Sequence, residues 1–323
     1  MSQISAASPK NLLKDPISWL YSLWKFSRPH TIIGTSLSVM ALYLITFGTH
    51  EMQVTANLDL ITKPSFILQL LTTWFACICG NIYIVGLNQL EDVAIDKINK
   101  PHLPIAAGEF SQKQAQWIIG ITGILALLLA AWLGHWLLAT VAVSLTIGTA
   151  YSLPPIRLKR FPFWAAICIF TVRGVIVNLG LFLHFQDKLG DTNFIPQEVW
   201  ALTLFILVFT VAIAILKDVP DMEGDKQYQI TTFTLLLGNQ AVFNLSRNLI
   251  TFCYLAMIIA GIFWLPQVNS LLMVIGHLLL LNLLWWRSQK VDLADKQEIS
   301  CFYQFIWKLF FLEYLLFPVA CLF

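Results

Sequence analysis

Apolar runs close to twenty residues long recur along this chain, and they limit the folds that it can adopt. A run of that length matches an α-helix that crosses the hydrocarbon core of a bilayer. Of the 323 residues, 58% are hydrophobic and only 12% are charged, which leaves too little charge to cover a water-soluble globule of this size. The sequence therefore predicts an all-α integral membrane protein. The net charge of +2 gives no reason to expect a nucleic-acid partner.

Windows of about nineteen residues predict nine transmembrane helices. The expected spans are 31–48, 66–87, 115–133, 135–150, 163–184, 198–216, 248–264, 268–286 and 303–322. Connecting segments rich in lysine and arginine alternate with segments that have few of them. Nine crossings with a cytoplasmic N-terminus require this alternation. We expect residues 1–24 to form a polar N-terminal tail and residues 25–323 to form a single membrane domain. The tail resembles neither a secretory signal nor an organelle transit peptide, which favours a bacterial protein or a processed chain.

Two acidic segments follow apolar runs and share one spacing. Asn88, Asp92 and Asp96 recur every four residues, so on a helix their side chains lie along one stripe. Asp221 and Asp225 repeat the spacing of Asp92 and Asp96. Taken alone, the first segment is equally compatible with a solvated helix end. The second copy favours a site for a hard divalent cation, which prefers oxygen ligands.

The charge alternation places both acidic segments on the cytoplasmic side. Carboxylates concentrated there repel one another unless cations lie between them. Mg²⁺ binds a few carboxylates together with the phosphate oxygens of a substrate, so two Mg²⁺ ions that hold a diphosphate fit this pattern. The expected metal ligands are Asn88, Asp92, Asp96, Asp221 and Asp225, and Asp218 is either a further ligand or a residue that contacts the ligands.

Basic residues on the same predicted side are candidates for binding the diphosphate, and Asn88 is expected to contact the substrate as well. The basic candidates are Lys97, Lys100, Arg157, Lys159, Arg160, Lys217 and Lys226. The same residues would also be present if they served membrane topology alone. Arg173 differs because it lies inside an expected span, where an arginine costs roughly 2.5–3.5 kcal/mol on insertion scales. It should face a polar cavity or a paired anion, and both a structural and a site role remain open.

Four blocks of the sequence resemble the UbiA superfamily of intramembrane prenyltransferases, in the branch that prenylates homogentisate. They read NQLEDVAIDKINKPHLPIAAGEFS, YSLPPIRLKR, VRGVIVNLGLFLH and KDVPDMEGDKQYQITT. The resemblance extends from about Trp24 to Phe323, and the sequence departs from it in the N-terminal tail and in the 186–197 loop. The short N-terminus resembles that of cyanobacterial members.

The resemblance implies a fold, a reaction and a location. It implies nine helices around a central cavity with cytoplasmic caps, and two Mg²⁺ ions held through both acidic motifs. Asp92, Asp96, Asp221 and Asp225 would then be the catalytic residues. The implied reaction transfers a phytyl group from phytyl diphosphate to homogentisate, with loss of its carboxylate, to give a methyl-phytyl-benzoquinol on the route to tocopherols. The implied location is a cyanobacterial thylakoid or plasma membrane.

Other functions remain open at this point. Geranylgeranyl or solanesyl diphosphate could be the donor, because cavity shape sets the length of the donor. Another aromatic compound or a chlorophyllide could be the acceptor, although the sequence VAIDKINKPHLPIAAGE favours homogentisate over chlorophyllide. A cation-coupled transporter is a more distant alternative, since acidic residues in a helical bundle also mark ion pathways. The carboxylates here lie at span ends beside lysines, however, which favours a diphosphate site. Nothing in the sequence indicates a protein partner.

Overall fold

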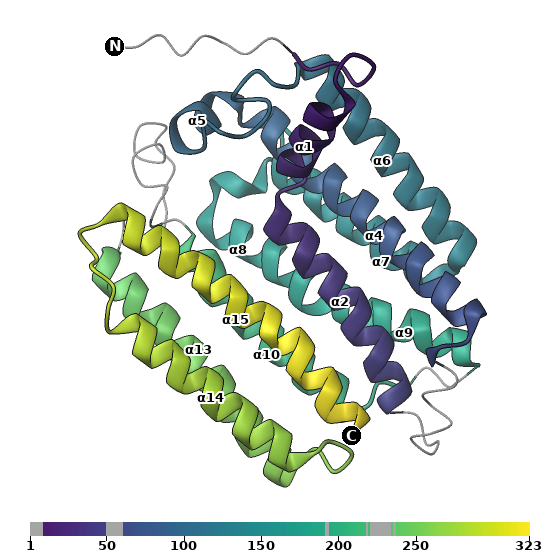
Figure 1. Cartoon of the computed structure of the whole chain (residues 1–323), viewed down its shortest axis with the longest axis vertical. Helices are drawn as coiled ribbons and strands as arrows, with labels where there is room; N and C mark the ends of the chain where they lie inside the picture. The colour runs from purple at the N-terminus through teal and green to yellow at the C-terminus, as the bar shows by residue number, and fades with distance from the viewer. Residues whose placement is uncertain (1–8, 50–60, 191–193, 218, 220–233, 235–236) are drawn as a thin grey trace.

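Helices account for the secondary structure that the computed structural model describes, which covers residues 9–49, 61–190, 194–217, 219, 234 and 237–323 (Figure 1). Proline stands in the first turn of several of these helices, where its missing N–H leaves no hydrogen bond unmade. Among them are α1 (Pro16–Phe26), α2 (Pro29–Gly48) and α4 (Pro64–Glu91). The apolar runs between such start signals therefore become separate helices of membrane length.

Eight helical segments of the described chain are long and apolar enough to cross a membrane. Besides α2 and α4, they are α6 (Gln112–Leu133), the segment Phe163–Leu189, α10 (Gln197–Leu216), α13 (Asn239–Phe263), α14 (Ser270–Ser288) and α15 (Lys296–Leu322). Each lies on one of the expected spans, which confirms the prediction of an all-α integral membrane protein.

The count of membrane-length helices is eight rather than nine, because the expected span 135–150 does not qualify. That span does form a helix, α7 (His135–Ser152). Its hydroxyl side chains lower its mean hydropathy, and two of them, Thr140 and Ser144, line an internal cavity. A helix that faces a cavity needs fewer apolar side chains than one surrounded by lipid.

The segment Phe163–Leu189 is not one regular α-helix. It consists of α8 (Pro162–Phe170), a π-helical turn η2 (Thr171–Ile176) and α9 (Val177–Leu189). The Nδ2 of Asn178 donates a hydrogen bond of 2.7 Å to the carbonyl of Gly174, so a side chain supplements the altered backbone bonding. Short π-helical turns are rare and frequently lie at functional sites.

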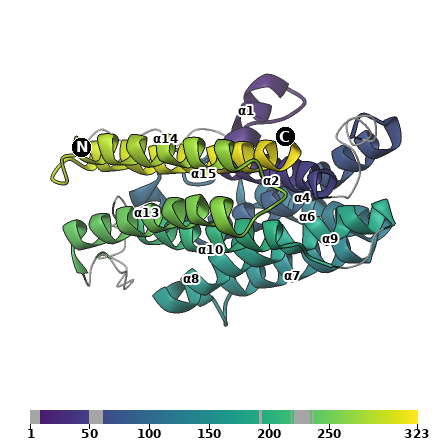
Figure 2. The ribbon, with the colours of Figure 1, turned by 90° about the horizontal axis from the view of Figure 1, so that it is seen from below.

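The C-terminal helix packs beside the first membrane helix. Helix α15 lies against α2, while α4 packs on α6, and α13 packs on both α10 and α14. Figure 2 shows α14, α15 and α2 above α13, α10 and α7. Large apolar side chains such as Leu68, Trp117 and Phe252 are exposed on the outer helices, as expected for surfaces that contact lipid.

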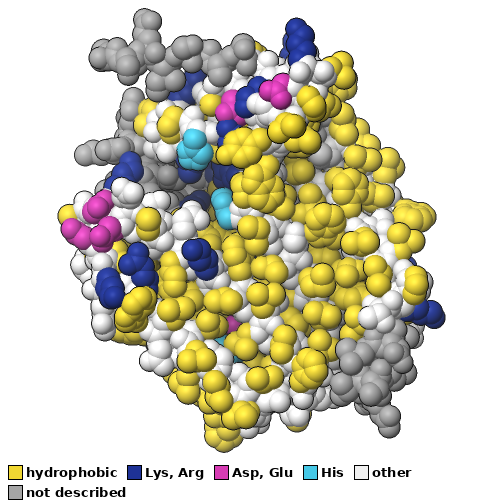
Figure 3. All heavy atoms as spheres, viewed as in Figure 1, with side chains coloured by type: hydrophobic (Ala, Val, Ile, Leu, Met, Phe, Trp, Pro, Cys, Tyr) yellow, Lys and Arg dark blue, Asp and Glu magenta, His cyan; other side chains and the backbone are white. Residues whose placement is uncertain are grey.

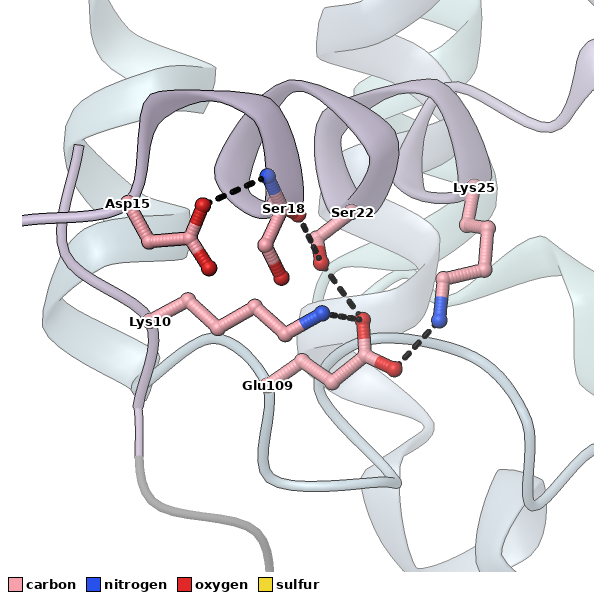
Figure 4. A network of polar contacts seen from close by, with 6 residues as sticks. All are labelled: Lys10, Asp15, Ser18, Ser22, Lys25 and Glu109. Atoms are coloured by element: carbon pink, nitrogen blue, oxygen red, sulfur yellow. Dashed lines mark hydrogen bonds and ion pairs between the residues drawn. The ribbon is translucent and has the colours of Figure 1, made fainter.

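One end of the bundle, here called the cap side, carries α5 (Val93–Asn99) and the loop 100–111. Helix α1 is tied to this loop by Glu109, which accepts a 2.6 Å hydrogen bond from Ser22 and pairs with Lys25 and Lys10 (Figure 4). Burial alone would raise the pKa of Glu109, but these hydrogen bonds and positive charges together lower it. The carboxylate is therefore ionised at neutral pH. We call this cluster the Glu109 latch.

Candidate active site

A cavity of about 310 Å³ lies inside the bundle. Its walls come from α2, α4, α7, α8, η2, α9, α10 and α15, which confirms the prediction of helices around a central cavity. Apolar and hydroxyl side chains line the part farther from the cap side. Polar, charged and tyrosine side chains line the cap-side end, namely Arg28, His30, Asn88, Tyr151, Lys217 and Tyr303. Figure 3 shows basic and histidine side chains around a hollow in the cap-side part of a largely apolar face.

The first acidic segment lies where α4 ends and α5 begins. Asp92 is the residue between the two helices, with φ −109° and ψ 17°. The backbone bonds continue across this break, because the Asp92 amide donates to Asn88 (3.1 Å) and the Asp96 amide donates to Asp92 (2.8 Å). The sequence predicted a helix through this segment, and the break at Asp92 was not foreseen. Asp96 lies on α5 and is 5% exposed.

Two basic residues of the loop after α7 reach Asp92 from the other side of the cavity entrance. Arg157 Nη2 lies 3.0 Å from Asp92 Oδ1, and Lys159 Nζ lies 2.6 Å from Asp92 Oδ2. Lys159 Nζ also donates to Asn88 Oδ1 at 3.1 Å. The structure thus brings together four of the predicted site residues, from segments about 65–71 positions apart. We call them the Asp92 cluster.

The loop that carries these basic residues has an uncommon backbone. Arg157 has a φ of 39° and precedes the short 3₁₀-helix η1 (Leu158–Arg160). A positive φ costs free energy in any residue with a side chain, and such residues gather at functional sites. Burial lowers the pKa of Lys159, although the charges of Asp92 and Asp96 act in the opposite direction. Lys159 is therefore a largely desolvated cation that carboxylates hold in place.

The chemistry of the first acidic segment fits a hard divalent cation. The oxygens of Asn88 and Asp92 already converge on one positive charge, the ammonium of Lys159. Within the described residues, no three Asp, Glu, His or Cys side chains come together as a metal-ligand group. The second acidic segment, with Asp218, Asp221, Asp225 and Lys226, lies outside the described residues. The described part therefore supplies one side of the predicted site.

Arg173 lies on the π-helical turn and lines the cavity. Its guanidinium stacks on two rings of α15, with centroid distances of 4.8 Å to Trp307 and 5.8 Å to Phe310. Gly34 on α2 lies beside it, and a Cβ added there would be 3.6 Å from Arg173 Nη1, an ordinary van der Waals contact. Among the described residues, no ion pair of Arg173 is recorded. The structure therefore places a buried cation beside aromatic rings in the cavity wall.

The remaining predicted basic residues do not join the Asp92 cluster. Lys97 is exposed on α5, and Lys100 follows that helix. Lys217 at the end of α10 lines the cavity. Burial lowers the pKa of His102, as do the positive charges of Lys100, Lys25 and Arg28. Positive charge is thus spread over the cap side beyond the cluster itself.

Sequence analysis missed several residues of the cavity. Arg28 connects α1 to α2 with a φ of 52°, and its buried Nε has no hydrogen-bond partner within the described chain. His30 stacks against Trp307 at 5.0 Å and lines the cavity, as does Tyr303 of α15. The only available signal was the Arg28-Pro29-His30 sequence at the start of an apolar run. The aromatic residues of α15 could not be told from membrane-facing ones.

Comparison with known proteins identifies the family. The sequence model of the UbiA prenyltransferase family matches residues 55–309. The chain belongs to the UbiA prenyltransferase family. The predicted family and the predicted enzyme class, a prenyltransferase, are thereby confirmed. The Asp92 cluster and Arg173 both lie within the matched UbiA region.

Individual relatives of this UbiA protein cover nearly the whole chain. It is 56% identical to the homogentisate phytyltransferase of Synechocystis sp., over 93% of this chain and 96% of that protein. It is 39% identical to the homogentisate solanesyltransferase of Arabidopsis thaliana, over 98% of this chain and 81% of that protein. A solved UbiA homolog from Archaeoglobus fulgidus, bound to GPP and Mg²⁺, has a TM-score of 0.60 at 16% identity, over 93% of this chain and 99% of that chain. That likeness shows the shared fold.

Proposed function

We propose that this UbiA protein transfers a phytyl group from phytyl diphosphate to homogentisate, with loss of the homogentisate carboxylate. The observation that carries the proposal is the Asp92 cluster at the cap-side end of an apolar cavity, in a chain 56% identical to a homogentisate phytyltransferase. A charged entrance suits a diphosphate, and an apolar interior suits an isoprenoid tail. The two parts of the cavity match the two parts of the donor.

The chain has two tasks, and the first of them lies at the diphosphate end. It must stabilise the negative charge that develops on the leaving diphosphate when the carbon–oxygen bond breaks. Electrostatic stabilisation of this kind is usually the largest contribution to lowering the activation free energy. Mg²⁺, when bound, would neutralise part of that charge. We propose that two Mg²⁺ ions are held by Asn88, Asp92 and Asp96 together with Asp221 and Asp225. Lys159 and Arg157 already lie at Asp92 and can turn to phosphate oxygens. We infer that Arg28 contributes a further cation, because its buried Nε awaits an acceptor.

The cavity walls have the second task, which is to guide the allylic carbon to the acceptor. Apolar side chains around the donor tail exclude water, which would otherwise react with the allylic cation that remains when diphosphate leaves. The homogentisate ring attacks the allylic carbon and loses a ring proton. Its carboxymethyl group loses carbon dioxide and takes up a proton to become the methyl group. Diphosphate is the other product, so atoms and charge balance.

Lys159→Met is expected to lower kcat/KM for phytyl diphosphate by about 10²-fold, the scale of removing one charge-stabilising donor. Steady-state kinetics with varied donor and saturating homogentisate measures it. Lys188→Met is the matched control, because Lys188 pairs with Asp187 at 3.9 Å at the end of α9, and it should leave the rate unchanged. Equal rates for Lys159→Met and wild type would remove Lys159 from the donor site.

The overall reaction is tested in vesicles that contain the purified protein. We expect labelled homogentisate and phytyl diphosphate to give a labelled prenyl-quinol and carbon dioxide when Mg²⁺ is present. Chelation should abolish product formation, and added Mg²⁺ should restore it. Geranylgeranyl and solanesyl diphosphate are given in parallel to rank the donors. A faster rate with either would reject phytyl transfer, and an undiminished rate after chelation would reject the metal dependence.

We further propose that residues 25–323 form a single catalytic domain in a cyanobacterial thylakoid or plasma membrane, with the cap side and N-terminus in the cytoplasm. The alternation of basic loops supports this orientation. The segment 1–24, expected to be a polar tail, includes most of α1 (Pro16–Phe26). The cap side would then receive homogentisate from the cytoplasm, while the donor enters from the bilayer.

Cation transport finds less support in the structure. A transport site would place a carboxylate deep in the membrane along the cavity. Glu313 of α15 lies deep in the bundle, but it is fully buried and its Oε2 is 3.1 Å from His277 Nε2 of α14. Neither residue lines the central cavity. This pair therefore joins two helices away from the site.

A further inference from the structure

Helix α1 and the turn before it present an apolar face that no other part of the described chain covers. Its residues are Leu13 (92% exposed), Ile17 (81%), Leu20 (55%), Tyr21 (61%) and Trp24 (43%). From Ile17 onward the spacing is three, one and three residues, so these side chains share one side of the helix. A face of this size in water would favour aggregation. Something apolar must cover it.

The opposite face of α1 is fixed to the cap side. Trp19 and Phe26 both pack on Phe110, and their ring centroids lie 5.6 Å and 5.8 Å, respectively, from that of Phe110. The Glu109 latch binds Ser22 and Lys25 on the same side (Figure 4). Packing and ion pairs therefore set the rotation of α1 about its axis, and they direct the apolar face away from the protein.

The position of α1 along the chain sets its depth. Only Ser27 and Arg28 separate α1 from α2, a helix long and apolar enough to cross the membrane. Figure 2 shows α1 projecting from the side of the bundle, next to α2, rather than lying over its end. An amphipathic helix at this level and on this side lies where the headgroups of the bilayer meet the acyl chains.

The lipid contact of α1 continues that of the membrane helices. On α2, Ile33 and Met40 are exposed, at 40% and 45%, and these side chains face the acyl chains. Exposed Tyr21 and Trp24 are the residue types that gather at the interface between water and membrane. The apolar outer face of α1 therefore joins the lipid-facing surface of the bundle.

We propose that the outer face of α1 is a docking surface for the lipid leaflet on the cap side, held in that orientation by the Glu109 latch.

This contact with lipid also helps to position the residues at the cavity entrance. Gln89 Nε2 on α4 donates to the carbonyl of Phe26 at 2.6 Å, and Asn81 Nδ2 donates to Thr31 Oγ1 at 3.0 Å. The corner between α1 and α2, which holds Arg28 at the cavity, is thus fixed by α4 on one side and by the membrane on the other.

The depth of spin labels in lipid nanodiscs tests this proposal. Single cysteines are introduced as Ile17→Cys, Lys14→Cys and Leu128→Cys in a Cys301→Ser background, since Cys301 is the exposed one of the six cysteines. Nitroxide labels then report accessibility to oxygen, which enters lipid, and to a water-soluble nickel chelate. The oxygen-to-nickel ratio at Ile17 should exceed that at Lys14 by about 5-fold and approach that at Leu128, because α1 inserts its apolar face into the interface.

Two outcomes would overturn the docking surface. Equal ratios at Ile17 and Lys14 would place the face in water. If the label at Ile17 is shielded from the nickel chelate only when each disc holds two copies of the protein, the face would instead contact a second copy of the chain.

The latch is tested in the same samples. Glu109→Gln should lower the ratio at Ile17 by about 2-fold and increase the mobility of the label, because α1 loses the ion pairs that fix its rotation. Glu298→Gln is the control, since Glu298 Oε2 accepts a hydrogen bond from the Asp292 amide in the loop before α15, far along the chain from α1. An unchanged label in Glu109→Gln would show that the latch does not orient the helix.

Discussion

Asp92→Ala is expected to lower kcat by about 10³-fold, an increase of about 4 kcal/mol in the activation free energy. Asp92 is proposed to bind the metal, and its carboxylate also holds Arg157 and Lys159 at 3.0 and 2.6 Å. Alanine removes both contributions at once and leaves two cations without their anion at the cavity entrance. The loss should therefore exceed that of Lys159→Met. Turnover of phytyl diphosphate and homogentisate across a Mg²⁺ titration measures it.

The Mg²⁺ titration separates the two contributions of Asp92. If the carboxylate binds metal, the Mg²⁺ concentration for half-maximal activity should rise in Asp92→Asn, which keeps one oxygen ligand. Asp187→Ala is the matched control, because Asp187 pairs with Lys188 at 3.9 Å outside the cavity. It should retain the wild-type rate. An Asp92→Ala protein with half the wild-type activity would contradict the role of Asp92 in this site.

All four residues of the Asp92 cluster were among the predicted site residues. Spacing alone placed Asn88 and Asp92 on neighbouring turns, and the alternation of basic loops put Arg157 and Lys159 on the same side as them. The contact between the two pairs could not be predicted, because it depends on a loop in which Arg157 has a φ of 39°. Helical periodicity carries no information about such a loop.

The errors elsewhere have a common physical origin. α7 was expected to be an ordinary span, yet it lines the cavity with Thr140 and Ser144, so its composition is that of an inner helix. Arg28 was not among the predicted site residues, yet the corner after α1 directs it to the cavity. In both cases the neighbours in space decide the role of a residue. The metal prediction at Asp221 and Asp225 stays a prediction, because both lie outside the described residues.

Arg173 has the features of an anchor for the acceptor carboxylate. An arginine inside a membrane helix is costly, by roughly 2.5–3.5 kcal/mol on insertion scales, and aromatic stacking on Trp307 and Phe310 offsets only part of that. Its guanidinium lines the cavity from a π-helical turn, which widens the helix at this point. Homogentisate brings a carboxylate, and a planar guanidinium binds a carboxylate through two hydrogen bonds.

Arg173→Met is therefore expected to raise the KM for homogentisate by about 10²-fold, near the 3 kcal/mol of a charged hydrogen bond, with the KM for phytyl diphosphate nearly unchanged. Arg173→Lys should recover only part of the affinity, because an ammonium lacks the planar fork. Arg247→Met is the matched control: Arg247 stacks on Trp285 at 4.4 Å and on Phe243 at 5.8 Å but does not line the cavity. It should keep both KM values.

Thermal unfolding of the same variants distinguishes a binding role of Arg173 from a structural one. Methionine keeps an unbranched apolar stem and has no buried charge to desolvate, so Arg173→Met should unfold at the wild-type temperature or above it. A large fall in unfolding temperature, with both KM values unchanged, would make Arg173 a structural partner of the α15 rings. A rise in the KM for the donor alone would assign it to the diphosphate. Because these outcomes differ in which constant moves, one set of kinetics and one melting curve decide between them.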